Sequence, residues 1–217
     1  MIAALVPVKA LRHSKSRLRP VLSDDQRRAF VMAMLEDVVG LLSDVPAVAT
    51  TAVVSPDADV LAFARKLGAQ PIREPPQPRG LNAALTYASD ALSRQGANSL
   101  LVLPVDIPLA TTADVEAILN RMNADTSIVL CPSRSGGTNA LALRPPGIIP
   151  FRFGQRSSAA HQREAKTRRL PLEVLPLPSL ALDIDHPHDL AAVLAHPNGT
   201  RSQQLLASLP LDPTAVP

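Results

Sequence analysis

The stretch SLLVLPVDIP, residues 99–108, is an apolar run that reaches Asp106 and stops there between two prolines. A short, uninterrupted apolar run of this kind is typical of a strand that is buried on both faces of a parallel sheet. A carboxylate at the end of such a strand lies where the sheet meets solvent, and open α/β sheets bind their ligands at that edge. Asp106 is therefore predicted to hold a metal ion rather than to support the core.

A second apolar run ends in the motif LDID, residues 182–185, and puts Asp183 and Asp185 at another predicted strand end. Residues two apart on an extended strand point to the same face, so both carboxylates could share magnesium while Ile184 points into the core. The alternative for Asp185 is an ordinary helix N-cap, because Pro187 follows two residues later and proline favours a first helical turn.

A basic loop, residues 9–19, follows the first predicted strand, residues 2–8. Its cations are Lys9, Arg12, Lys15, Arg17 and Arg19. Because the carboxyl ends of parallel strands meet at one edge, the loop should face Asp106 there, where cations suit a nucleoside triphosphate. A solvated basic loop is the alternative, with equal weight from this segment alone. The chain has neither a GxGxxG fingerprint nor a GxxxxGK[ST] loop, so dinucleotide and Walker-type sites are not supported.

The segment FRFGQRSS, residues 151–158, brings a glycine and two hydroxyls to the start of a predicted helix over residues 157–169. Free N–H groups at a helix start attract anions, so this segment is a candidate anion site. The alternative is that Ser157 merely caps the helix. The five histidines have no metal-ligand spacing, and no serine, histidine and acid arrangement indicates nucleophilic catalysis.

Strand and helix patterns alternate along the chain, which predicts a doubly wound α/β fold. Ser23 and Gln26 form a capping box at the start of the first long helix. The turn at Gly136 and Gly137 predicts a hairpin, and so one antiparallel strand in an otherwise parallel sheet. The other expected strands cover residues 50–54, 70–73, 126–132 and 138–143. The other expected helices cover about 57–67, 81–94 and 187–195, and a further helix is expected to begin at a cap formed by Thr111 with Asp114.

The chain of 217 residues is expected to form one domain over residues 1–195 and a loose tail over residues 196–217. Three leucines of the tail, at positions 205, 206 and 209, could still dock on the body. The first apolar stretch is too short for a signal peptide or a membrane span, so a cytoplasmic location and no membrane partner are expected.

Composition narrows the function classes further. A net charge of +3 with only 2% aromatic residues and no Trp disfavours a nucleic-acid partner, which needs a basic stripe and stacking rings. Cys131 is the only cysteine, so the chain can form no internal disulfide and no thiolate zinc cluster. Its apolar surroundings in sequence predict an inert core thiol rather than a nucleophile.

With these segments placed, the sequence resembles the 2-phospho-L-lactate guanylyltransferase family of coenzyme F-420 biosynthesis, which lies within the MobA-like nucleotidyltransferases. The likeness runs from Met1 to about Leu194, and the order and spacing of its motifs carry it. These are VPVKALRHSKSRL at 6–18, GLNAAL at 80–85, LPVDIPL at 103–109, GTNAL at 137–141, RFG at 152–154 with Ser157, and LDID at 182–185.

The resemblance implies a Rossmann-like MobA-type nucleotidyltransferase fold, with a mostly parallel mixed sheet and helices on both faces. It also implies that the enzyme transfers GMP from GTP to a small phosphorylated carboxylic acid and releases pyrophosphate. The acid would be 2-phospho-L-lactate, phosphoenolpyruvate or 3-phospho-D-glycerate. The product would pass to the next enzyme of the pathway, and a homodimer is left open.

Site residues carried over by the resemblance fall into four groups. The implied ligands of Mg2+ are Asp106, Asp183 and Asp185. Asp106 and Lys15 are the implied catalytic residues. The acid substrate would be bound by Thr138, Gly154 and Ser157. The nucleotide would be bound by Lys9, Lys15, Arg17, Gly80 and Asn82.

Two alternatives remain at this level. One is a MobA-like enzyme acting on a sugar phosphate or molybdopterin, which is disfavoured because residues 10–14 contain none of the glycines usual in the first loop of that superfamily. The other is a noncatalytic nucleotide-binding protein that kept the fold. Retention of all three aspartates argues against it, and magnesium-dependent pyrophosphate release would separate the two.

Overall fold

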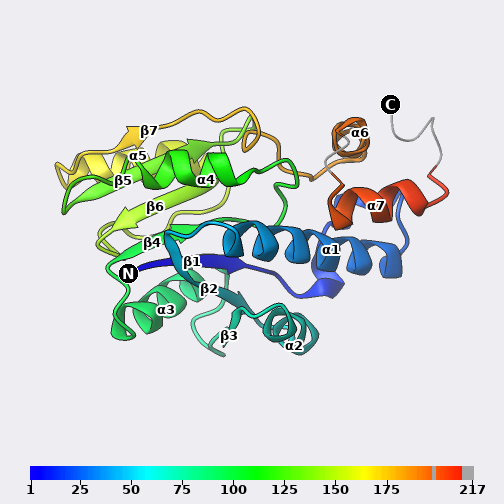
Figure 1. Cartoon of the computed structure of the whole chain (residues 1–217), viewed down its shortest axis with the longest axis horizontal. Coiled ribbons are helices and arrows are strands. Elements are labelled where there is room, and N and C mark those ends of the chain that lie inside the picture. Colours follow the sequence, from blue (N-terminus) through cyan, green and yellow to red (C-terminus); the bar gives the residue numbers. More distant parts are fainter. Residues whose placement is uncertain (197–198, 212–217) are drawn as a thin grey trace.

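The computed structural model describes residues 1–196 and 199–211 (Figure 1). Its centre is a mixed sheet whose strands are ordered β3-β2-β1-β4-β6-β5-β7. The strands are β1 (Ile2–Pro7), β2 (Val48–Ser55), β3 (Gln70–Arg73), β4 (Ser99–Val102), β5 (Ser127–Pro132), β6 (Thr138–Arg144) and β7 (Glu173–Val174). β6 runs antiparallel to both β4 and β5, whereas the other pairings are parallel. The predicted antiparallel strand is thus confirmed, and β7 is an addition.

Helices cover both faces of the sheet. They are α1 (Asp24–Ser43), α2 (Ala58–Lys66), α3 (Leu81–Arg94), α4 (Thr112–Leu119), α5 (Ser157–Thr167), α6 (Pro187–Ala195) and α7 (Arg201–Ser208). The predicted capping box of Ser23 and Gln26 is present at the start of α1. Two short 3-10 turns, η1 (Leu11–His13) and η2 (Ser16–Leu18), lie in the basic loop after β1.

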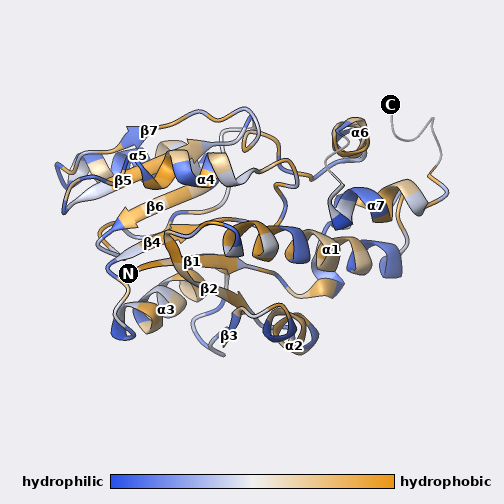
Figure 2. Ribbon diagram, in the orientation of Figure 1, coloured by the Kyte–Doolittle hydropathy of each residue, from blue (hydrophilic) through white to orange (hydrophobic). Residues whose placement is uncertain are grey.

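Period-two alternation along β1 divides the core into two layers. Ala4 and Val6 face the layer that α1, α2, α4, α6 and α7 supply, whereas Ala3 and Leu5 face the layer under α3 and α5. All four residues are fully buried. Figure 2 shows the apolar residues gathered on the strands and on the inner faces of the helices. The predicted α/β fold with helices on both faces is therefore confirmed.

The strand that carries Asp106 ends earlier than predicted. β4 stops at Val102, although the Leu103 backbone N–H still donates to the Leu5 carbonyl at 3.1 Å. Pro104 has no N–H to extend the ladder, so the chain leaves the sheet there. Asp106 consequently lies in the loop beyond the strand, four residues past its end.

The apolar run before Asp185 is not a strand, contrary to the prediction. Residues 180–185 are irregular, and prolines at 176 and 178 interrupt the donors that a ladder would need. The run is anchored instead by the Ile184 backbone N–H, which donates to the Asp106 carbonyl at 2.9 Å. Ile184 is fully buried as expected, and its hydrogen bond fixes the two aspartate-bearing loops to each other.

Asp185 is not the N-cap of the last predicted helix. His186 occupies that position of α6, and Asp189 Oδ2 accepts from the backbone N–H groups of His186 at 2.6 Å and of Asp185 at 2.9 Å. Asp189 thus satisfies the helix start from within the first turn. The carboxylate of Asp185 is left free to point elsewhere.

The segment expected to be a loose tail contains α7, which packs on α1. The backbone N–H groups of Arg201 and Ser202 donate to the Asp37 carboxylate at 2.7 and 2.9 Å. Leu206 is 1% exposed, so the alternative in which the leucines dock on the body holds for this helix. Residues 197–198 and 212–217 of the expected tail lie outside the described residues. Across the described ranges, no helix is at once long enough and apolar enough to cross a membrane.

Candidate active site

Two adjoining clefts open at the carboxyl end of β1. The wide cleft, of about 1110 Å³, lies against η1 and the loop between β3 and α3. The carboxylate cleft, of about 720 Å³, is lined by the loops that carry the three aspartates and by the start of α5. The clefts have Pro7, Val8, Lys9, His13 and Leu81 in common. They therefore form one continuous hollow along the edge where open α/β sheets bind ligands.

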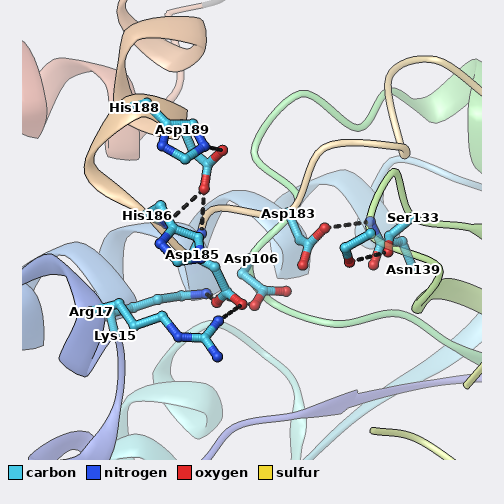
Figure 3. Close-up of polar contacts among 11 residues, drawn as sticks. Lys15, Arg17, Asp106, Ser133, Asn139, Asp183, Asp185, His186, His188 and Asp189 are labelled. Carbon is cyan, nitrogen blue, oxygen red and sulfur yellow. Dashed lines mark hydrogen bonds and ion pairs between the residues drawn. The ribbon is translucent and has the colours of Figure 1, made fainter. Parts of the chain in front are cut away.

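Lys15 is the buried cation of the carboxylate cleft. Its backbone is left-handed, with φ 50°, and this conformation turns the loop so that the side chain points inward. Nζ lies 2.6 Å from Asp106 Oδ2 and 3.2 Å from Asp185 Oδ1, and the side chain is 7% exposed (Figure 3). Burial alone would lower the pKa of Lys15, but the two carboxylates outweigh it and raise the pKa above its ordinary value. Lys15 is therefore a fixed positive charge.

Arg17 makes the outer contact of this network. Its Nη1 lies 3.1 Å from Asp185 Oδ2, and its side chain is 61% exposed. Both oxygens of Asp185 are thus engaged by cations, one buried and one at the rim. Because an exposed pair of this kind contributes little to stability, Arg17 can exchange Asp185 for an incoming anion at small cost.

Arg27 of α1 anchors the loop that carries Lys15. Its Nη1 donates to the Ser14 carbonyl at 2.7 Å, and its Nη2 is paired with Asp24. The side chain is 2% exposed, and its Nε has no hydrogen-bond partner among the described residues. A guanidinium in this position fixes the backbone immediately before Lys15.

Asp183 lies on the other side of Asp106. Asn139 Nδ2 donates to the Leu180 carbonyl at 2.7 Å and contacts Asp183 Oδ1 at 3.5 Å. Burial raises the pKa of Asp183, and the neighbouring charge of Asp106 raises it further. A bound cation would relieve this repulsion between Asp183 and Asp106.

The three predicted metal ligands line one cleft, but they do not form a cage by themselves. Within the ranges that the structure describes, no group of three or more His, Cys, Asp or Glu residues could hold a metal ion. Both oxygens of Asp185 are engaged by Lys15 and Arg17, whereas Asp106 contacts Lys15 through Oδ2 alone. Asp106 and Asp183 are therefore the pair that keeps carboxylate oxygens for a cation. Such a pair fits Mg2+, which proteins commonly hold by one or two carboxylates together with substrate phosphates and water.

The three predicted acid-binding residues line the carboxylate cleft together with the aspartates. Gly154 has φ 137°, a conformation that is strained for any other residue, and Arg156 has φ 53° at the N-cap of α5. These turns place Ser157 at the first position of α5, where it is 1% exposed. Ser157 is therefore not the N-cap, and the simple capping alternative is wrong.

His161 of α5 lies behind Thr138 and is fully buried. Its Nδ1 lies 3.1 Å from Thr138 Oγ1, and its Nε2 accepts from the Arg152 backbone N–H at 2.9 Å. Burial lowers the pKa of His161 to about 4, so the ring is neutral near pH ~7. From the sequence His161 could contact a phosphate or carboxylate, but a surface position is favoured, because single histidines are more often surface residues. The surface position is wrong.

The predicted nucleotide contacts divide between the clefts. Lys9 lines both clefts and Gly80 lines the wide one, whereas Lys15 and Arg17 line the carboxylate cleft. Asn82 lines neither cleft. Its amide is committed to Phe153, accepting from the backbone N–H at 2.8 Å and donating to the carbonyl at 3.1 Å. Asn82 therefore holds the loop that leads to Gly154.

Cys131 is outside this chemistry. It is fully buried in β5, and burial raises the pKa of its thiol to about 12. The predicted inert core thiol agrees with this environment.

Comparison with known proteins decides the family. The protein-family model described as "Guanylyl transferase CofC like" matches residues 2–215 of the chain. The chain belongs to this guanylyl transferase family. As a member of the CofC-like family it is a nucleotidyltransferase enzyme, as the resemblance implied.

Curated CofC-like relatives carry three different substrate names. The chain is 39% identical over 203 residues to a phosphoenolpyruvate guanylyltransferase of Sphaerobacter thermophilus, covering 93% of this chain and 97% of that protein. It is 36% identical to a 2-phospho-L-lactate guanylyltransferase of Methanothermobacter thermautotrophicus, over 95% of this chain and 90% of that one. It is also 36% identical to a 3-phospho-D-glycerate guanylyltransferase of Phenylobacterium zucineum, over 96% and 97%.

A solved structure confirms the fold. The chain matches a putative nucleotide-diphospho-sugar transferase from Desulfovibrio desulfuricans with a TM-score of 0.79 at 19% identity. The match covers 95% of this chain and 94% of the other. At this identity the likeness shows the nucleotidyltransferase fold alone.

Proposed function

We propose that this enzyme transfers GMP from GTP to a small phosphorylated carboxylic acid and releases pyrophosphate, as a step of coenzyme F-420 biosynthesis. The observation that carries the proposal is the carboxylate cleft, in which buried Lys15, the pair Asp106 and Asp183, and the hydroxyls of Thr138 and Ser157 line one hollow. The family and the substrate names of its relatives supply the class of acid: 2-phospho-L-lactate, phosphoenolpyruvate or 3-phospho-D-glycerate.

The wide cleft is the proposed place of the GTP base and ribose. Its volume of about 1110 Å³ suits a nucleoside, and it shares the lining residues Lys9 and Leu81 with the carboxylate cleft. Bound in this way, the triphosphate would reach Lys15 and Arg17, and its α-phosphate would lie between them and the acid. Thr138, Gly154 and Ser157 line the carboxylate cleft, which is where the acid is proposed to bind.

The reaction needs no protein base. An oxygen of the acid's phosphate is already anionic, so it attacks the α-phosphorus of GTP directly. A new P–O bond forms as the bond from the α-phosphorus to the bridging oxygen breaks, and pyrophosphate leaves with the electron pair. The buried His161 is compatible with this step, because both of its ring nitrogens are occupied by Thr138 and the Arg152 backbone.

The main obstacle is repulsion between anions. At a separation of about 4 Å and an effective dielectric constant near 20, each pair of like unit charges costs about 4 kcal/mol. Lys15 offsets part of this repulsion, because its ammonium is fixed in the cleft and the neighbouring carboxylates raise its pKa. Asp106 and Asp183 would hold Mg2+, which when bound supplies charge neutralisation and alignment of the phosphates.

The direct test is pyrophosphate release with purified protein, Mg2+ and GTP, with each of the three acids supplied in turn. The expected result is release that requires one of these acids and that yields a guanylylated acid of the correct mass, trapped by the next enzyme of the pathway. ATP and CTP in place of GTP test the base preference. Absence of release with every acid would contradict the proposal and favour a noncatalytic nucleotide-binding protein.

A matched pair of variants ties the activity to the cleft. Asp106→Asn keeps the shape of the side chain and removes its charge, and should lower kcat about a thousandfold, since several kcal/mol of charge stabilisation is lost. Asp125→Asn makes the same change at an exposed aspartate that lines neither cleft, and should leave kcat unaltered. Full activity of folded Asp106→Asn would remove Asp106 from the reaction.

A further inference from the structure

We propose that His161 is a positioning residue for the acid substrate, because it forces the Thr138 hydroxyl to donate its proton into the carboxylate cleft. The inference rests on the proposed function, in which the group that meets this proton is an anionic oxygen of the acid. No step of the proposed transfer uses this buried histidine. The inference gives it a defined part in substrate selection.

The tautomer of His161 follows from one hydrogen bond. The Arg152 backbone N–H can only donate, and it points at His161 Nε2 at 2.9 Å, so Nε2 must carry a lone pair. A neutral imidazole that accepts at one nitrogen is protonated at the other, which places the hydrogen on Nδ1. Nδ1 lies 3.1 Å from Thr138 Oγ1, so the ring donates and the hydroxyl oxygen accepts.

The surroundings of the ring keep it neutral. His161 is fully buried, and this burial is the largest influence on its pKa, lowering it to about 4. The charged groups that face the ring oppose each other, since Glu164 raises the pKa and Arg152 lowers it. The backbone of Ser157 also faces the ring and raises the pKa. Every contact is thus consistent with a proton on Nδ1 and a lone pair on Nε2.

The consequence falls on Thr138. Its hydroxyl cannot donate to His161, whose nearer nitrogen already carries a hydrogen. Among the described residues, His161 is the only hydrogen-bond partner of this hydroxyl. Thr138 is 4% exposed, and what is exposed of it lines the carboxylate cleft. The hydroxyl proton is therefore available to the cleft, where it selects an acceptor such as a carboxylate or phosphate oxygen over a donor.

The same ring also helps to fix the loop that carries Gly154. By accepting from Arg152, His161 holds the residue that precedes Phe153, and Asn82 holds Phe153 itself on both its backbone groups. Two successive residues before Gly154 are thus pinned. His161 connects the strand that carries Thr138 with the loop that carries Gly154.

Two substitutions separate donation to Thr138 from ordinary core packing. The amide nitrogen of Asn can overlay His Nδ1, so His161→Asn can keep the donor to Thr138 and lose the acceptor for Arg152. The amide of Gln overlays Nε2 instead, so His161→Gln can keep the acceptor and lose the donor. His196→Gln makes the same change at an exposed histidine that lines neither cleft and serves as the control.

The readout is the split between the Michaelis constants of the two substrates, measured by pyrophosphate release with the acid that the wild type uses. His161→Gln should raise KM for the acid about tenfold, the loss expected of one hydrogen bond to a charged group, with KM for GTP changed less than about twofold. His161→Asn should raise KM for the acid several-fold less than His161→Gln. His196→Gln should match the wild type in both constants.

Equal increases in His161→Asn and His161→Gln, or a parallel rise in KM for GTP, would overturn the proposal. Thr138→Val gives the second test if His161→Gln does not fold, because it removes the hydroxyl and keeps the ring. An increase in the acid KM matching that of His161→Gln supports the proposal, and an unchanged acid KM overturns it. Failure of the proposed function is a separate outcome, since the wild type itself would then release no pyrophosphate.

Discussion

Lys15 is a positive charge that is almost completely buried in the site. An ammonium that is 7% exposed would be expelled or neutralised without partners, and it is retained because two carboxylates lie within 3.2 Å of it. An arriving triphosphate can replace Asp106 and Asp185 as the ion-pair partner of the Lys15 ammonium. The aspartates then become available to a cation that accompanies the nucleotide.

Replacing Lys15 tests whether this charge serves the reaction. Lys15→Met keeps the apolar stem and should lower kcat about a hundredfold, the loss typical for one preorganised charged donor at a phosphoryl group. Lys15→Arg, which keeps the charge with a different shape, should recover part of that loss. Steady-state kinetics with circular dichroism as a folding check decide the matter. A folded Lys15→Met enzyme with kcat within about threefold of the wild type would make Lys15 a purely structural ion-pair partner.

His161 gives a prediction for stability against pH. Its pKa is lowered from 6.5 to about 4 in the folded protein, so between these values the unfolded chain binds a proton that the native state does not. The free energy of unfolding should therefore fall as the pH is lowered through this window, by up to about 3 kcal/mol from this residue. Urea unfolding at several pH values should show a shallower fall for His161→Gln than for the wild type. Parallel curves for the two proteins would contradict the lowered pKa.

At the scale of single residues, the sequence predicts the positions of those site residues that follow from the direction of the strands in the sheet. Asp106 and Asp183 could be assigned to one edge because open α/β sheets gather their loops there. The roles of Asn139 and His161 could not be predicted, since they depend on contacts between segments that are distant in sequence. The inward turn of Lys15 depends on a left-handed backbone at a non-glycine residue, and no local pattern in the basic loop predicts it.

At the scale of elements, the helices act mainly by fixing loops. α1 holds the Lys15 loop through Arg27, α3 holds the Gly154 loop through Asn82, and α6 satisfies its own start through Asp189 and so frees Asp185. The helices themselves could be predicted from capping residues and apolar periodicity, and α3 has the predicted limits. The error in the run before Asp185 has a local cause as well, because prolines at 176 and 178 break a pattern that is otherwise typical of a strand.

Asn82 distinguishes a loop clamp from a nucleotide ligand. Asn82→Ala removes both hydrogen bonds to Phe153, so it should raise KM for the acid by about tenfold and lower the free energy of unfolding by about 1–2 kcal/mol. KM for GTP should stay within about twofold. Asp90→Ala, a change on the exposed side of the same helix, serves as the control. A selective rise in KM for GTP would instead support the nucleotide role that the family resemblance implies.

At the scale of the whole molecule, α7 is part of the packing although it lies in the segment expected to be a tail. α7 lies beside α1 and α6 in Figure 1, and its Leu206 joins the layer of core that α1 covers. The sequence could not settle this, because a short helix of low hydrophobicity after a polar stretch has the composition of a tail. Its docking depends on Asp37 of α1, which caps the two residues at the start of α7.

Removal of the buried leucine measures what this docking contributes. Leu206→Ala should lower the free energy of unfolding by about 2–4 kcal/mol, as for other fully buried leucines. Leu194, which is 37% exposed, provides the matched control, and Leu194→Ala should cost less than about 1 kcal/mol. Denaturant unfolding of the two variants gives both values. Equal and small effects would return α7 to the status of a loosely attached segment.

The account as a whole depends on Asp106 and Asp183 holding a divalent cation against the phosphates of the nucleotide. Mn2+ can stand in for Mg2+ in a crystal grown with a nonhydrolysable GTP analogue, and its anomalous scattering locates the ion directly. The account predicts a peak about 2.1 Å from an oxygen of each of these two carboxylates and of the triphosphate. A Mn2+ ion bound to the analogue but to neither aspartate would contradict it.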